Sequence, residues 1–208
     1  MSHLQSLRIK AISEEEVLEL QSMSSPPLLL QTLGLSGRLE KFPEWILKLN
    51  SIVKISLFWS KLKEDPLKVL QALPNLMRLW LVDGYGGEQL HIEGGGFQKL
   101  KFLGLRNLGG LNRLIIDEGA LPLLVELVIG ECPQLKEVPS GIHHLKSLKI
   151  LEFDEMPTEF VLSLQPDEGP DFGKVKHIPS ITFGYKTHGI YYEIYNLGDS
   201  ELLKRLQK

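Results

Sequence analysis

The stretch "LKEVPSGIHHLKSL", residues 135–148, decides the fold, because an earlier stretch, "LEKFPEWILKLNSI" (residues 39–52), has the same apolar pattern. In both stretches a proline follows the second apolar residue, and the offset between them is 96 residues throughout. The matching positions are Leu39, Phe42, Ile46, Leu49 and Ile52 against Leu135, Val138, Ile142, Leu145 and Leu148. An apolar pattern repeated at a fixed distance indicates a repeat architecture.

The triplet L-x-x-L-x-L, with Ile or Phe allowed, occurs seven times along the chain. Its first members are Leu4, Leu30, Ile52, Leu76, Leu100, Leu124 and Leu148, so the spacings are 26, 22, 24, 24, 24 and 24 residues. The distance of 96 residues is therefore four repeats of 24. The alternative is a leucine-rich globular α/β domain in which such triplets arise by chance, and four consecutive spacings of 24 argue against it.

The L-x-L core of each triplet alternates with period two and predicts a short strand with one buried face. About twenty residues then return the chain to the next strand, which is typical of leucine-rich repeats. Apolar residues every third position between strands predict short 3₁₀ or α turns. We therefore predict an α/β solenoid, a leucine-rich-repeat horseshoe of about seven 22–26-residue repeats, with parallel strands on the concave face and short turns on the convex face.

The repeat pattern weakens after residue 163. A degenerate triplet, Ile178-Ile181-Phe183, is followed by strand-like residues, and Asp199 is a candidate N-cap for a closing helix. We predict a solenoid over residues 1–163, and a degenerate last repeat with a C-terminal cap over residues 164–208. The first triplet begins at Leu4 with no polar capping segment before it, so we expect the chain to be the C-terminal part of a longer protein.

Composition points to a reducing, cytoplasmic location. The formal net charge of −3 and the pI near 6.1 give no electrostatic case for nucleic acid, and no apolar run is long enough for a membrane span or a signal peptide. The single Cys132 excludes an internal disulfide. Cys132 and Ser60 occupy the repeat position whose side chain bonds to the backbone between coils, so we predict a buried structural thiol.

Motifs for catalysis or cofactor binding are absent from the sequence. No phosphate-binding loop or nucleophile elbow occurs, "GGG" at residues 94–96 is typical of a loop, and "DFG" at residues 171–173 lacks the other kinase motifs. The six histidines are scattered, and His143-His144 is expected to face solvent. We expect no enzyme activity, no cofactor and no metal.

The remaining candidate site is the concave face, where the residues between the leucines of each strand are expected to point. Basic residues fall in repeats one to five and acidic residues in repeats six and seven, with large aromatics between them. Aromatics beside arginines are typical of interaction hot spots. Two plain alternatives remain open: an aromatic can tuck under a neighbouring loop, and the charges can form a solvated face. The predicted partner-binding residues are Lys54, Phe58, Trp59, Arg78, Trp80, Phe102, Arg106, Glu126 and Glu152.

The amino-acid sequence of the segments between the strands shows a family resemblance. It is found in "LSGRLEKFPEWILKL" (residues 35–49), "LKEDPLKVLQALPNLMRLWL" (62–81), "GGFQKLKFLGLRNL" (95–108) and "GALPLLVELVIGECPQLKEVPSGIHHLKSLKIL" (119–151). The chain resembles the C-terminal leucine-rich-repeat region of plant coiled-coil nucleotide-binding leucine-rich-repeat disease-resistance receptors.

That resemblance implies the sensor module of an intracellular immune receptor, which recognises a pathogen effector or a guarded host protein and restrains the upstream nucleotide-binding switch. The alternative is a purely structural or autoinhibitory module that contacts only its own nucleotide-binding domain. A ribonuclease-inhibitor-like protein would have longer repeats with regular helices. An extracellular receptor ectodomain would be expected to show glycosylation sequons, paired cysteines and a signal peptide.

Overall fold

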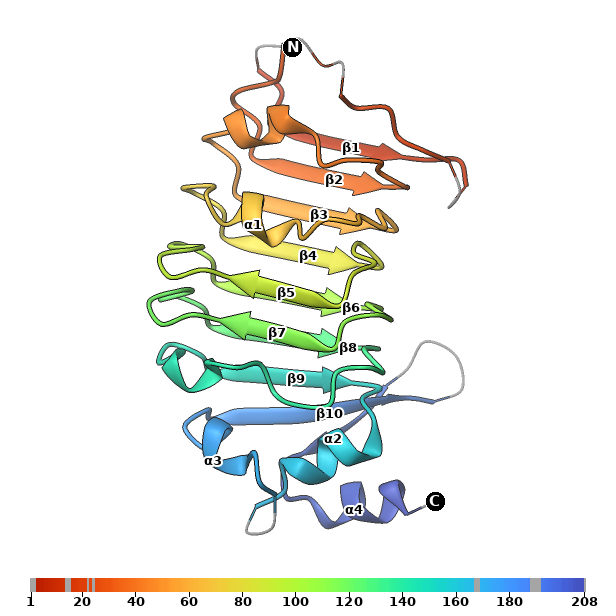
Figure 1. Cartoon of the computed structure of the whole chain (residues 1–208), viewed down its shortest axis with the longest axis vertical. Coiled ribbons are helices and arrows are strands. Elements are labelled where there is room, and N and C mark those ends of the chain that lie inside the picture. The colour runs from red at the N-terminus through yellow and green to blue at the C-terminus, as the bar shows by residue number, and fades with distance from the viewer. Residues whose placement is uncertain are drawn as a thin grey trace.

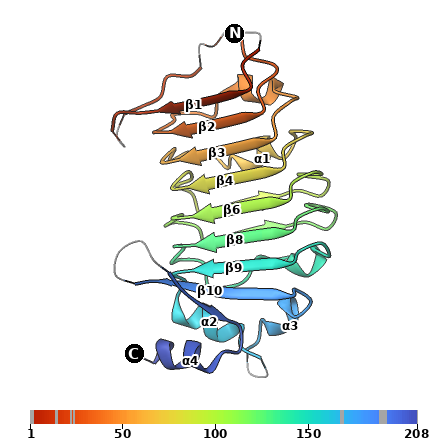
Figure 2. The same ribbon diagram turned by 180° about the vertical axis from the view of Figure 1, so that it is seen from behind.

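The computed structural model describes residues 3–13, 16–21, 23, 25–166, 169–187 and 192–207, and it is an elongated stack of coils with the two termini at opposite ends (Figure 1). Nine strands form one sheet, which covers one side of the stack (Figure 2). In spatial order they are β1 (Ser6–Lys10), β2 (Thr32–Ser36), β3 (Lys54–Phe58), β4 (Arg78–Val82), β6 (Phe102–Arg106), β8 (Glu126–Gly130), β9 (Ile150–Asp154), β10 (Ser180–Lys186) and β11 (Tyr192–Asn196).

Within this sheet β1, β2, β3, β4, β6, β8, β9 and β10 pair in parallel, and among the described strands β11 alone runs antiparallel to its neighbour. The seven triplets predicted from the sequence all form strands of this sheet, and the degenerate triplet at Ile181 and Phe183 forms the eighth, β10. Equivalent residues lie opposite each other, as in the row Leu33, Ile55, Leu79, Leu103, Leu127 and Leu151. The predicted leucine-rich-repeat solenoid is confirmed.

The hydrophobic core lies between this sheet and the return segments, because one residue in two along each strand points inward. The core row of leucines and isoleucines from Leu33 to Leu151 is completely buried. Cys132 is completely buried, as predicted. Ser60 is completely buried as well, but its hydroxyl has no hydrogen-bond partner among the described residues, so the bond to neighbouring backbone expected at this repeat position is not formed. The Cys132 thiol lies 3.3 Å from the Gly130 carbonyl oxygen, and burial raises its pKa to about 11.

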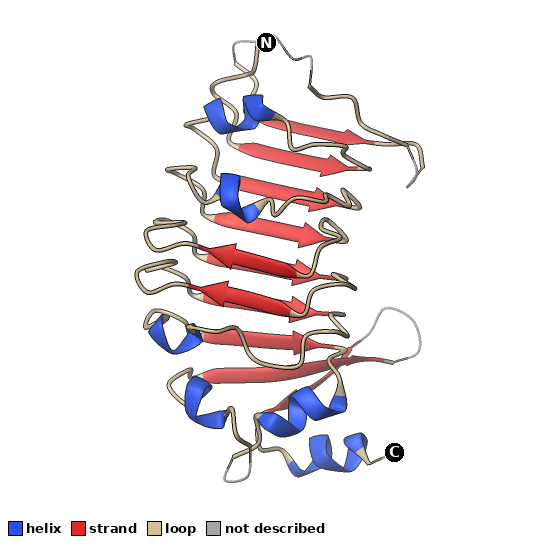
Figure 3. Cartoon of the chain, viewed as in Figure 1, coloured by secondary structure: helices blue, strands red, loops and turns tan. Residues whose placement is uncertain are grey.

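The return segments on the other face contain the predicted short turns and an additional small sheet (Figure 3). The turns are η1 (Glu44–Lys48), α1 (Leu67–Leu70) and η2 (Ile142–His144). The fourth and fifth repeats instead form the parallel strands β5 (Gln89–Ile92) and β7 (Arg113–Ile116). In both of these strands a buried Leu and a buried Ile flank a less buried residue, His91 in β5 and Ile115 in β7, which is the period of a strand and differs from the turn period of the other segments.

The sixth repeat does not continue the small sheet as a third strand. Among the described residues it pairs with β7 through a single bridge between Ile115 and Ser140, in which the Ser140 N–H donates to the Leu114 carbonyl and the Ser140 carbonyl accepts from the Ile116 N–H, at 3.0 Å each. Pro139 precedes the bridge, and a proline has no N–H to donate to a ladder. The segment before it therefore separates from β7.

A left-handed backbone residue follows five consecutive strands. Trp59, Asp83, Asn107, Glu131 and Glu155 have φ between 47° and 56°, and they are spaced 24 residues apart. This conformation turns the chain sharply from the sheet into the return segment. It is unfavourable for residues with a Cβ, most of all for a bulky one such as Trp59.

The C-terminal part closes the stack with three helices and the β10–β11 hairpin. The helices are α2 (Thr158–Ser163), α3 (Phe172–Val175) and α4 (Ser200–Leu206). The Asp199 side chain accepts a hydrogen bond of 2.9 Å from the Glu201 N–H, so the predicted N-cap is confirmed. Leu202 of α4 is buried against the core, whereas Ile194 of β11 is exposed.

Candidate interaction surface

The solvent-facing side of the main sheet, here called the concave face, is formed by every second residue of its strands. The register aligns these residues in rows across the coils. One row contains Lys54, Arg78, Phe102 and Glu126, a second Ser56, Trp80, Gly104, Val128 and Glu152, and a third Phe58, Val82, Arg106, Gly130 and Asp154. Eight of the nine predicted site residues therefore lie in these rows, and Trp59 does not.

Trp80 forms the aromatic centre of the concave face, and Gly104 makes its position possible. The indole lies over Gly104, where a Cβ would overlap the ring. In this position it contacts Phe102, with the two ring centroids 4.8 Å apart. The guanidinium of Arg78 lies 4.2 Å from the centroid of the Phe102 ring, and that of Arg106 lies 5.7 Å from the Trp80 ring. Trp80 is half-buried, with Phe102 and the Arg106 guanidinium against its ring.

The prediction that Phe102 is an exposed anchor is wrong, because only 2% of its surface is accessible. Trp80 and Arg78 cover the ring from the neighbouring strand. Its role is to support them from below. Phe102 can thus affect binding only through the position of Trp80 and Arg78.

Arg106 forms an ion pair across two strands. Gly130 lies between Arg106 and Asp154 in the third row. A Cβ on Gly130 would lie 2.9 Å from the Asp154 Cβ, so the glycine leaves room for the Arg106 side chain to reach Asp154. The Arg106 guanidinium donates to Asp154, and it also lies 5.6 Å from the centroid of the Tyr192 ring. Because Asp154 is only 4% exposed, its carboxylate depends on Arg106 for its partner. Tyr192 was not anticipated from the sequence, since only the β10–β11 hairpin brings it here.

The acidic side chains of repeats six and seven are partly neutralised within the molecule. Burial raises the pKa of the Asp154 carboxyl, and Arg106 opposes that shift. Burial, together with the charges of Asp154 and Glu126, also raises the pKa of Glu152. Lys186 forms an ion pair of 2.9 Å with Glu131, and its backbone N–H donates to Glu155.

The N-terminal half of the concave face contains a hollow of about 450 Å³, here called the basic groove. Its charged side chains are Arg8, Lys10 and Lys54, and it is lined by no carboxylate. Small residues form much of its floor, and the Arg8 stem lies against Gly34, where a Cβ would approach the Arg8 Cγ to 3.3 Å. Its remaining lining residues are Ile9, Thr32, Leu33, Gly34, Ser36, Ser56, Phe58 and Trp80.

Trp59 does not line the basic groove, contrary to its predicted place in the site. Its left-handed backbone directs the chain out of the sheet, and the ring lies beside Phe58 with the two centroids 6.5 Å apart. Glu126 and Glu152 lie on the concave face, as predicted, but among the acidic side chains of β8 and β9.

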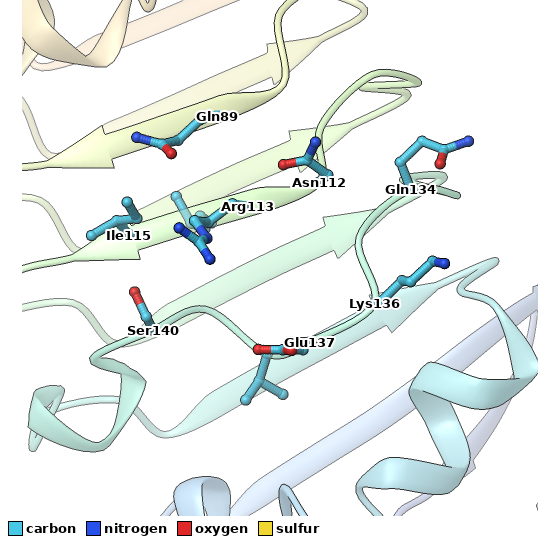
Figure 4. Close-up of a pocket in the computed structure, with 10 residues that line it drawn as sticks. Gln89, Asn112, Arg113, Ile115, Gln134, Lys136, Glu137 and Ser140 are labelled. Atoms are coloured by element: carbon cyan, nitrogen blue, oxygen red, sulfur yellow. The ribbon is translucent and has the colours of Figure 1, made fainter.

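A second hollow, of about 580 Å³, lies on the opposite side of the coils beside β7 (Figure 4). It opens where the segment before Pro139 separates from the strand. Its charged lining is mixed, with Arg113 and Lys136 beside Glu137. No sequence motif marks this hollow.

Neither a metal centre nor a membrane span is found in the described part of the chain. No group of three or more His, Cys, Asp or Glu side chains in the described ranges is arranged to hold a metal ion. No helix among the described residues has the length and apolar character needed to cross a bilayer.

Comparison with known proteins gives the family. A family model described as "leucine-rich repeat region" matches residues 1–159. Disease resistance protein RPM1 of Arabidopsis thaliana is 32% identical over 187 residues, which cover 89% of this chain and 20% of that protein.

Two further relatives from Arabidopsis thaliana agree with this match. Probable disease resistance RPP8-like protein 4 is 36% identical over 155 residues, 74% of this chain and 17% of that protein. Probable disease resistance protein RF45 is 31% identical over 189 residues, 90% of this chain and 18% of that protein. The chain thus spans about a fifth of the length of the curated relatives that it matches. It belongs to the leucine-rich repeat family, in the form found in plant disease resistance proteins.

Proposed function

We propose that this chain is the protein-interaction sensor module of an intracellular plant immune receptor. In this proposal it recognises a pathogen effector or a guarded host protein, and in the absence of that signal it restrains an upstream nucleotide-binding switch. It acts in the cytoplasm, has no catalytic role and uses no cofactor. The names of the matching relatives support the receptor class.

The observation that supports a binding role for the concave face is the exposed part of Trp80. Its ring packs on Phe102 and lies over Gly104 with Arg106 beside it, so its position is set by contacts within the chain before any partner arrives. A rigid aromatic loses little conformational entropy on binding, and arginine and tryptophan are enriched at the centres of interfaces.

The test is Trp80→Ala in a receptor that carries this region, expressed in leaf tissue with and without the pathogen signal. We expect loss of the triggered response with a quiet resting state, because truncating a buried anchor typically costs ~2 kcal/mol or more of binding. Leu123→Ala is the matched control, since Leu123 is exposed and lies outside the main sheet. That variant should respond normally.

The two other outcomes have distinct meanings. A receptor that becomes active without any trigger would favour the purely autoinhibitory role, in which Trp80 contacts the receptor's own nucleotide-binding domain. Wild-type behaviour in both states would show that Trp80 contributes to neither role and would overturn the proposal for this surface.

A further inference from the structure

The four N-terminal strands present cations on the concave face without any carboxylate. Their outward positions hold Arg8, Lys10, Lys54 and Arg78, and β1 to β4 contain neither Asp nor Glu. Within the described residues, no ion pair joins Arg8, Lys10 or Lys54 to an acidic side chain. These three charges therefore remain available to a partner.

The acidic half of the same face differs, because the molecule supplies its own cations there. Arg106 binds Asp154, and Lys186 binds Glu131 and donates its N–H to Glu155. This compensation is partial, because Glu126 and Glu152 form no ion pair among the described residues. On the N-terminal half no carboxylate of the described chain offsets the cations, so the charge that a partner must complement there is positive.

From this asymmetry we infer that the basic groove binds a short, extended, acidic segment of a partner protein, which ends in a large apolar side chain placed against Trp80. This inference rests on the proposed function and specifies the chemistry of the partner. Opposite charges steer association and set specificity, and Trp80 supplies the apolar contact.

Strand geometry sets the length and spacing of that segment. Neighbouring strands lie ~4.8 Å apart, so the distance across β1 to β4 is roughly 14 Å, which an extended chain of about four residues covers at ~3.3 Å per residue. Arg8 and Lys54 are two strands apart and are offset by two residues along the strands, so they are separated by roughly 12 Å. Carboxylates three residues apart in the segment, roughly 10 Å, are within reach of these two long side chains.

The experiment uses the 208-residue chain and a fluorescein-labelled hexapeptide, Glu-Ser-Ser-Glu-Ser-Leu, with binding measured by fluorescence anisotropy at low salt. A peptide with Gln in place of both Glu residues is the ligand control. The protein variant is Arg8→Gln with Lys54→Gln, and its matched control is Lys136→Gln with Lys146→Gln, which removes two exposed cations away from the concave face. Circular dichroism establishes that both variants fold.

We expect the Glu peptide to bind the unmodified chain at least tenfold more tightly than the Gln peptide. The Arg8/Lys54 variant should lose that difference, and the Lys136/Lys146 variant should keep it to within a factor of two. Equal binding of both peptides, or an equal loss in both variants, would refute the inference. So would an oligothymidine of six nucleotides that binds through Arg8 and Lys54 while the acidic peptide does not, since the groove would then recognise phosphates.

The failure of this inference can be distinguished from that of the proposed function. If the peptide does not bind but Trp80→Ala still abolishes the triggered response, the sensor role stands and the acidic segment is wrong. If the peptide binds but Trp80→Ala leaves the receptor unchanged, the groove binds acidic chains and the proposed sensor role falls.

Discussion

Gly104 is the residue on which the aromatic centre depends. Alanine at this position would place a Cβ inside the Trp80 indole, and the ring would have to leave Phe102. We expect Gly104→Ala to lower the free energy of unfolding by about 1–3 kcal/mol, as overpacking does, and to shift tryptophan emission to longer wavelength as Trp80 becomes solvated. Gly109→Ala is the control, because a Cβ there meets nothing within 4 Å. Equal effects of the two substitutions would contradict this account.

The ion pair between Arg106 and Asp154 predicts a stability change with a defined pH dependence. Arg106→Ala leaves Asp154 buried without its cation, which should cost about 3 kcal/mol of stability at pH 7. Burial already raises the pKa of Asp154, and loss of Arg106 removes the stronger of the two cations that lower it, the other being Lys186. A carboxyl whose pKa is higher in the folded state than in the unfolded state lowers the free energy of unfolding as pH rises from the unfolded-state pKa to the folded-state pKa.

The stability lost in Arg106→Ala should therefore shrink as pH falls from 7 towards 4, where Asp154 becomes protonated and neutral. Urea unfolding at pH 7 and pH 4.5 measures this change. Adding Asp154→Asn should restore most of the stability at pH 7, because the neutral amide removes the buried charge. A loss that is the same at both pH values would show that the pairing with Asp154 does not cause it.

At the scale of the element, the period of the apolar residues is sufficient to locate the parallel strands of the main sheet. The triplets placed Leu33, Leu79 and Leu127 in the core row, because a strand that buries one face must alternate. β5 and β7 were missed even though Leu90 and Ile92, like Leu114 and Ile116, alternate in the same way. Their signal is only four residues long, and neighbouring repeats use turns at the equivalent place.

The surface was harder to predict than the strands. Which face each residue occupies follows from periodicity, so eight of the nine site residues were placed on the concave face. Whether a side chain is exposed depends on the conformations of its neighbours. Phe102 is buried because Gly104 leaves room for the Trp80 ring beside it, and Trp59 leaves the face because its backbone is left-handed. The β10–β11 hairpin brings Tyr192 next to Arg106, and the repeat pattern does not extend to this hairpin.

Leu103→Asp tests the register of the strands. Leu103 is completely buried between the neighbouring coils, so aspartate would place an uncompensated charge in the core and cost several kcal/mol. We expect loss of cooperative unfolding in urea, followed by circular dichroism. Lys101→Asp is the control, because Lys101 is two residues away and exposed. A soluble Leu103→Asp variant with a cooperative transition would show that the register is wrong.

At the scale of the whole molecule, Cys132 reports on how the stack opens. The thiol is completely buried in the sixth coil, and with a pKa of about 11 only roughly one molecule in a thousand carries the thiolate at pH 8. We expect alkylation by iodoacetamide to require unfolding of that coil, and its rate to rise with urea in parallel with loss of the circular dichroism signal. Fast alkylation in the absence of urea would show that the sixth coil opens separately from the stack.

The rows of the concave face also have an evolutionary consequence. Because inward and outward residues alternate strictly along each strand, most outward side chains can be exchanged without any change in the leucines that stabilise the coil. Stability and ligand choice are then encoded by separate sets of codons in the same short segment. Selection can change the outward residues and so the binding specificity, while it keeps the inward leucines unchanged. The exceptions include the glycines at 104 and 130, where an outward position also fixes the shape of its neighbours, and the buried outward residues Phe102 and Asp154. These are the sites at which sequence change should be slowest.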